Sequence, residues 1–141
     1  MRIAFLTSIY PTHAEKIYKE NPLLKYKSSD EQIEFIRWHA LSSYVRWFEL
    51  LGQKGFATCA FNHNLPEVAL AWAKENKFEP KSIDIIHEIG LEKIKQFKPD
   101  VIFSFAPLTY LKNNFLEELI GALYKRPKVK LRYKVNKPTA T

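Results

Sequence analysis

Cysteine, glycine and long apolar runs are all scarce in this 141-residue chain. Its single cysteine, Cys59, has no intramolecular partner, which excludes a disulfide framework and favours a reducing compartment. No stretch approaches the roughly 18 apolar residues that a membrane span requires, and no signal-peptide pattern opens the chain. We therefore expect a soluble, cytoplasmic protein, long enough for one domain with its own core.

Acidic residues are missing from the C-terminal end. All fifteen of them lie between Glu15 and Glu118, whereas seven of the twenty-two basic residues follow Tyr124, so residues 1–124 have no net charge. The net charge of +7 belongs to the tail. We predict a domain over residues 1–124 and a basic tail or edge strand over 125–141. This distribution does not predict specific binding to a nucleic acid. It leaves open a weak contact of the tail with an anionic membrane surface.

Short apolar runs alternate with helical periodicities along the chain. Ile3–Leu6, Phe56–Phe61 and Val101–Phe105 have the composition of strands, and the last is apolar enough to predict helices on both of its faces. Residues 129–135 alternate apolar and basic side chains, as in an exposed edge strand. The predicted helices are Asp30–Leu51, Pro66 to about Asn76, the segment from Ile83 to Phe97, and Asn113–Leu123, whereas His13–Tyr26 is predicted as a loop with a short helical turn.

The longest predicted helix, Asp30–Leu51, has signals at both ends. Ser29 and Gln32 have the spacing of a capping box, and Gly52 provides a left-handed stop. Its apolar residues recur at steps of three and four and form a stripe that should pack on the sheet. That stripe consists of Ile33, Ile36, Ala40, Tyr44, Trp47, Phe48 and Leu51.

The order of these elements predicts the α/β class: a Rossmann-like, doubly wound, mostly parallel sheet of about four strands with helices on both faces. If Ile3–Leu6 is the central strand and Val101–Phe105 lies beside it, the turns after both strands flank the topological switch point, where such sheets bind ligands. Ser8–His13 and Ala106–Tyr110 would then line one crevice.

Several nucleotide and metal sites are disfavoured at this crevice. The turn after the first strand, TSIYPTH, has no glycine to let backbone N–H groups approach a pyrophosphate. Asn62 and His63 stand where an acidic residue would hold a ribose. No acidic residue follows the first strand to hold magnesium, and the four histidines lie on separate elements. We predict neither a cofactor nor a bound metal.

Histidines and tyrosines remain as candidates for function. A neutral His13 at the crevice mouth could take a proton from a sugar hydroxyl, although a solvated loop histidine is the more common case. His63 has the same ambiguity, whereas His39 and His87 lie on helices as structural or surface groups. Tyr10 and Tyr110 lie in turns where aromatic rings could stack on sugars. Trp47 and Trp72 are predicted to be core residues.

Six segments carry a resemblance to a known family. The chain resembles the N-terminal domain of bacterial glycosyltransferases with the two-domain GT-B fold, specifically the group similar to spore-maturation-type transferases. The segments cover most of residues 1–125. They are IAFLTSIYP, SSDEQ, YVRWFELLG, the asparagine of FNHN, LAWAKEN and FKPDVIFSF.

The resemblance implies the acceptor-binding half of a nucleotide-sugar-dependent sugar transferase, with a sugar or glycan acceptor as partner. The nucleotide-sugar donor would bind a second domain that this sequence does not contain, so independent catalysis is not expected. The alternative is a non-catalytic, free-standing α/β binding or interaction module. Under the first interpretation His13 is catalytic, and the acceptor contacts are Ser8, Tyr10, Asn62, Ser104 and Tyr110.

Overall fold

A three-stranded parallel sheet forms the centre of the protein. The computed structural model describes residues 1–39, 44–104 and 115–123, and in this part the strands are β1 (Arg2–Thr7), β2 (Ala57–Asn62) and β3 (Val101–Ser104). Their order is β2-β1-β3, so β1 is central and β3 lies beside it, as the sequence predicts. The fold is α/β and Rossmann-like. The predicted fourth strand, residues 129–135, lies outside the described residues.

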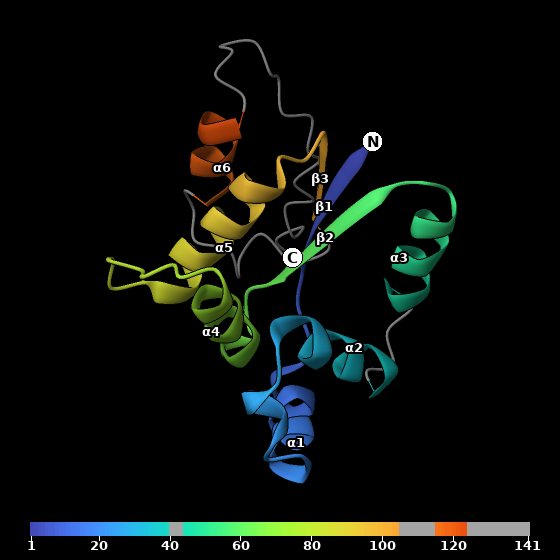
Figure 1. The fold of residues 1–141 in the computed structure, drawn as a ribbon, viewed down its shortest axis with the longest axis vertical. Coiled ribbons are helices and arrows are strands. Elements are labelled where there is room, and N and C mark those ends of the chain that lie inside the picture. The colour runs from blue at the N-terminus through green and yellow to red at the C-terminus, as the bar shows by residue number, and fades with distance from the viewer. Residues whose placement is uncertain (40–43, 105–114, 124–141) are drawn as a thin grey trace, which may run out of the picture.

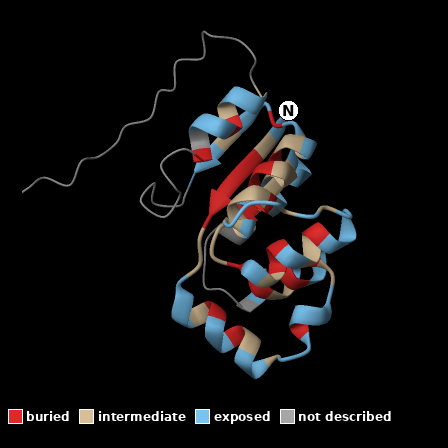
Figure 2. Ribbon diagram, turned by 90° about the vertical axis from the view of Figure 1, so that its left-hand side faces the viewer, coloured by how far each residue is buried: buried red, intermediate tan, exposed pale blue. Residues whose placement is uncertain are grey.

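One face of the sheet is covered by two helices, α5 (Ile85–Phe97) and α6 (Phe115–Leu123). Every second residue of a strand faces the same side of the sheet, so Ala4 and Leu6 on β1 both point into this layer and pack on its apolar side chains. Figure 2 shows the central strand as a buried band between the outer elements. This cluster, called the sheet core below, contains Ala4, Leu6, Phe61, Leu91, Ile94, Phe115 and Leu119.

The other face of the sheet is less covered. Helix α3 (Tyr44–Gln53) packs against β2 and lies across the sheet from α5 and α6 (Figure 1). On β3, however, Val101 is 40% exposed and Phe103 is 47% exposed. The prediction of a strand covered on both faces is therefore wrong for β3, because α3 lies at the far edge of the sheet beside β2.

The segment predicted as one helix over Asp30–Leu51 contains two described helices, α2 (Ser29–His39) and α3, and residues 40–43 of the prediction lie outside the described residues. The packing partners of the two helices differ, since α2 contacts α4 (Pro66–Glu75) and α3 contacts β2. The predicted single stripe therefore does not face one surface, and Trp47, predicted to be core, is 47% exposed. Trp72, in contrast, packs beside Ala73 and Ile89 as predicted.

The capping box and the left-handed glycine predicted at the two ends of this segment are both found at other residues in the structure. The capping box consists of Ser28 and Glu31: the Glu31 N–H donates to Ser28 Oγ at 3.2 Å, and the Ser28 N–H donates to the Glu31 carboxylate at 2.9 Å. Ser29 bonds to Glu75 on α4 instead. Helix α3 continues through Gly52, and Gly55, with φ of +86°, terminates it in the left-handed conformation that glycine adopts without strain.

The segment His13–Tyr26, predicted as a loop with a short helical turn, is mostly helical. Helix α1 (Pro11–Glu20) and the 3₁₀ turn η1 (Leu24–Tyr26) lie with α2 beyond the carboxyl ends of the strands (Figure 1). Pro11 begins α1 with a φ already suited to a helix. Apolar side chains from these helices and from α4 pack against one another. This cluster, called the helical cap, contains Ala14, Ile17, Leu24, Ile36, Leu65 and Val68.

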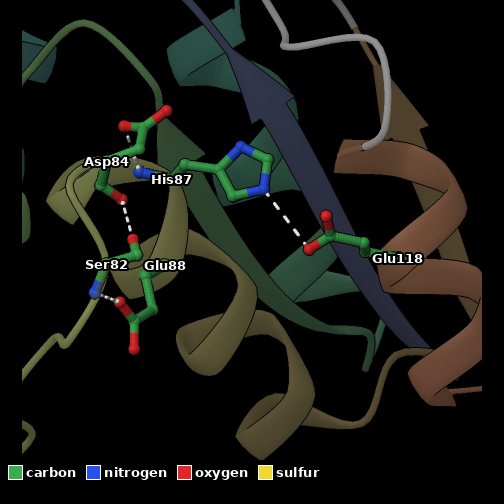
Figure 3. Close-up of polar contacts among 5 residues, drawn as sticks. All are labelled: Ser82, Asp84, His87, Glu88 and Glu118. Atoms are coloured by element: carbon green, nitrogen blue, oxygen red, sulfur yellow. Dashed lines mark hydrogen bonds and ion pairs between the residues drawn. The ribbon is translucent and has the colours of Figure 1, made fainter.

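Polar contacts fix the start of α5 and its link to α6. The Asp84 carboxylate accepts the His87 N–H at 3.3 Å, and the Glu88 carboxylate accepts the Ser82 N–H (Figure 3). The Glu88 carboxylate also accepts the Lys81 N–H. His87 Nε2 lies 3.5 Å from the Glu118 carboxylate on α6. These contacts agree with a structural role for His87. Ile83, which was predicted to lie on the apolar face of this helix, precedes it and is fully exposed.

The predicted bounds of the three described strands and of α4 and α5 agree with the structure to within one or two residues. Helix α4 begins at Pro66, and α5 ends before Pro99. Arg2 secures β3 to β1, because its backbone N–H donates to the Asp100 carboxylate at 2.8 Å. In the described part of the chain, no helix combines the length and the apolar composition needed to cross a membrane.

Candidate functional site

The candidate site lies at the carboxyl edge of the sheet, where the strand order changes direction. The connection after β1 leads to β2 on one side of it, and the connection after β2 crosses to β3 on the other side. The topological switch point is therefore between β1 and β3. Ser8 follows β1, and Ser104 ends β3 opposite Leu6 in the register. The switch point is therefore flanked by two hydroxyl side chains, one just after β1 and one at the end of β3.

Two asparagines tie the loop after β2 to the loop after β1. The Asn64 side chain binds the backbone of Ile9 through both of its polar atoms: Oδ1 accepts the Ile9 N–H at 3.1 Å, and Nδ2 donates to the Ile9 carbonyl. Asn62 Oδ1 accepts a hydrogen bond from the Thr7 hydroxyl. An amide side chain matches a peptide group in both donor and acceptor, which explains asparagine at position 64. The two loops form one fixed unit.

His63 lies between these asparagines and also contacts β1. Its ring Nδ1 is 3.3 Å from the Thr7 carbonyl oxygen, and its backbone N–H is 3.4 Å from the same oxygen. Partial burial lowers the pKa of the imidazole below its usual value, because the charged form loses solvation. At neutral pH the ring is thus an uncharged hydrogen-bonding group at the edge of the sheet.

Five of the six sequence-predicted site residues lie in the described part of the chain. Ser8, Tyr10 and His13 follow one another from the end of β1 into the first turn of α1, and Tyr10 is 82% exposed. Asn62 is tied to Thr7, and Ser104 lies on the opposite side of β1. Tyr110 and the rest of Ala106–Tyr110 lie outside the described residues.

Sequence reasoning missed the residues that join the loops. Thr7 and Asn64 make the contacts described above, yet no periodicity or motif singles them out. His63 is recognised from the sequence only as an ambiguous loop histidine, without its contact to Thr7. The available signal was the turn FNHN itself, since asparagine side chains commonly bond to nearby backbone groups at strand ends. The residues that it contacts, Thr7 at the end of β1 and Ile9 just after it, are however 55 positions away in the sequence.

The chemistry of this edge is that of uncharged hydrogen-bonding groups. The loop residues from Ser8 to Tyr10 and from His63 to Leu65 include a hydroxyl, an imidazole and an amide, but no carboxylate. Among the residues that the structure describes, no three histidine, cysteine, aspartate or glutamate side chains gather as a metal site. Such an edge suits a neutral ligand with several hydroxyl groups better than a phosphate or a metal complex.

Cys59 on β2 is a poor nucleophile in this setting. Burial raises the pKa of its thiol, although the positive charges of Lys93 and Arg2 act in the opposite direction. Lys93 itself donates to the Ala60 carbonyl at 2.8 Å. We infer that this pair belongs to the packing of β2 against α5.

Comparisons with known proteins give no further assignment. No family model matches the chain, and neither the curated proteins nor the solved structures searched contain a match.

Proposed function

We propose that the protein is the acceptor-binding half of a sugar transferase and that the loops after β1 and β2, with Ser104 at the end of β3, bind the hydroxyl groups of a sugar or glycan acceptor. The observation that carries this proposal is the fixed, uncharged carboxyl edge, in which Asn64 and Asn62 hold the two loops together. Acceptor hydroxyls need oriented donors and acceptors rather than a positive charge. The resemblance to GT-B N-terminal domains supports the same assignment.

A fixed edge contributes to transfer chiefly by orientation. The acceptor hydroxyl must be held in line with the anomeric carbon of the donor, and residues that do not move on binding can supply this order in advance. The diphosphate leaving group needs positive charge or backbone N–H groups. Donor binding is therefore assigned to a second Rossmann-like domain.

The binding step can be measured on the chain itself. We suggest titrating the ¹⁵N-labelled protein with a panel of methyl glycosides of hexoses and N-acetylhexosamines. The expected result is a set of shifts confined to the backbone amides of Ser8, Ile9, His63 and Ser104. Ser8→Ala should weaken binding by about five-fold, the value of one typical hydrogen bond. Ser82→Ala, at the exposed turn before α5, is the matched control.

Two outcomes would contradict this proposal. Shifts confined to another surface, or no shifts with any glycoside, would contradict an acceptor site at the carboxyl edge of the sheet. The transfer step is checked by measuring release of nucleoside diphosphate from nucleotide sugars when a donor-binding domain and the bound glycoside are both present. Binding without transfer across donors would support the alternative, a non-catalytic α/β binding module.

A further inference from the structure

We propose that residues 129–135 dock on the outer edge of β3 as a fourth strand of the sheet, parallel to β3. These residues lie outside the described part of the chain, so the inference rests on what the described elements require of the chain that follows α6. It concerns a different edge of the sheet from the acceptor site and does not depend on the proposed function.

Helix α6 runs along the sheet beside α5 and in the same direction (Figure 1). Both helices begin at the carboxyl edge, where the Phe115 ring lies 4.8 Å from the His87 ring and stacks on Phe61 at the end of β2. Later residues of α6, Leu119 and Leu123, still pack on the sheet core. The chain therefore leaves α6 toward the amino edge, where a strand parallel to β3 has to begin.

The sequence after α6 suits such a strand. Residues 124–128 are left to make the turn, and connections from a helix to a parallel strand commonly have about 2–6 residues. Residues 129–135 then alternate apolar and basic side chains, which is the pattern of a strand with two different faces.

The handedness of the crossover determines on which side this strand lies. Crossovers between parallel strands of one sheet are right-handed in about 98% of cases. The crossover from β2 through α5 carries the chain over the sheet-core face, past β1, to β3. Because α6 lies on this same face, a right-handed crossover from β3 must continue in the same direction, away from β1. The next position in that direction is the outer edge of β3.

The exposed side chains of β3 show what the strand would cover. Ile102 packs against the sheet core, so Val101 and Phe103 face the opposite side, where they are 40% and 47% exposed. Burying lysines against the apolar sheet core would be costly. We therefore expect Lys130 and Arg132 on the open side, where their aliphatic stems can cover apolar surface beside β3.

Hydrogen exchange of single amides tests the pairing in the full chain. The Asp100 N–H donates to the Arg2 carbonyl on β1 at 2.8 Å, and successive amides of a strand point to opposite sides. The Ile102 amide thus points to β1, whereas those of Val101 and Phe103 point to the outer edge. We expect all three amides to exchange slowly. Exchange of the two outward amides at the rate of an unstructured peptide would overturn the inference.

Nuclear Overhauser effects in the same sample identify what covers the edge. We expect contacts between backbone protons of residues 129–135 and those of β3, in the order that parallel pairing requires. Contacts in antiparallel order would overturn the inference. Protection of the outward amides that rises with protein concentration, without contacts to residues 129–135, would assign the edge to a second copy of the chain instead.

Proline substitutions in the full chain complete the test. Because neighbouring amides point to opposite sides, either Leu131→Pro or Arg132→Pro must remove a hydrogen bond to β3. We expect one of them to speed exchange of the two outward amides by about ten-fold or more, and the control Thr139→Pro to leave it unchanged. Continued protection of Ile102 shows that the variant is folded. Unchanged exchange in both folded variants would overturn the inference, and if either unfolds, the contacts in the unmodified chain decide.

Discussion

The sheet core and the helical cap are held together by different interactions. In the sheet core, apolar residues of β1, β2, α5 and α6 pack directly on one another, and the Phe61 and Phe115 rings stack at 5.8 Å. The helical cap contains apolar residues too, but a buried polar group lies beside them. Gln32 is completely buried and bonds to the Tyr18 hydroxyl at 2.7 Å and to the Lys27 carbonyl at 2.9 Å.

This difference explains which region the sequence could predict. Apolar packing on a strand or helix leaves a period of two or about 3.6 residues, which a sequence displays. A buried glutamine leaves no such pattern. Without its contacts, Gln32 resembles an exposed capping residue, and α1 resembles a loop because Lys16, Lys19 and Glu20 obscure its short apolar face. The candidate site lies where these two regions meet.

The largest expected effect tests the sheet core. Leu119 on α6 is fully buried there, so Leu119→Ala should lower the free energy of unfolding by about 2–5 kcal/mol, through lost burial and the cavity left behind. Urea denaturation measures the change. Leu70→Ala, at a half-exposed position on α4, is the control and should cost well under half as much. Equal losses would mean that α6 is not part of the sheet core.

The next effect tests the polar network of the helical cap. Gln32→Met keeps the side-chain volume but removes the partners of Tyr18 and Lys27, and should cost about 1–3 kcal/mol of unfolding free energy. The same substitution at Gln96, on the exposed side of α5, is the control. A double-mutant cycle with Tyr18→Phe should show coupling between the two side chains. Additive losses would contradict the hydrogen bond between them.

A third effect tests how closely α5 approaches the sheet. A Cβ at Gly90 would lie 2.4 Å from the Phe61 ring, so Gly90→Ala should destabilise the protein by about 1–2 kcal/mol despite the better helix propensity of alanine. In α6, such a Cβ at Gly121 would have no atom of the described residues within 4 Å, and Gly121→Ala should stabilise by up to about 1 kcal/mol. Thermal unfolding of the two variants measures both changes in stability, which should have opposite signs. A stabilised Gly90→Ala would show that the helix sits farther from β2.

The smallest effect appears only at alkaline pH and belongs to the helical cap. Burial, and secondarily the charge of Glu67, raises the pKa of the Tyr18 phenol above its usual value of about 10. The unfolded chain then loses this proton more readily than the folded one, so stability should fall as the pH rises above about 10. Tyr18→Phe should reduce this slope in unfolding measurements, whereas Tyr26→Phe, at an exposed ring, should not. Equal slopes in all three proteins would contradict a buried phenol.

The sequence by itself determined the α/β class, the three described strands and the helices α4 and α5. Their apolar periods and their Pro66 and Pro99 boundaries are local properties of the chain. It also determined that the turn after β1 lacks the glycines of a phosphate loop. Ser8, Tyr10 and His13 could be grouped from sequence because they follow one strand directly.

Tertiary structure alone decided how the carboxyl edge is built. Asn64 contacts Ile9, and His63 contacts Thr7, only because parallel pairing places β2 beside β1, although the partners are 55 and 56 positions apart in the sequence. The same holds for Ser29, which bonds to Glu75 rather than capping its own helix. Long-range polar contacts depend on which two backbone segments lie side by side in the fold. A local pattern of residues does not contain that information.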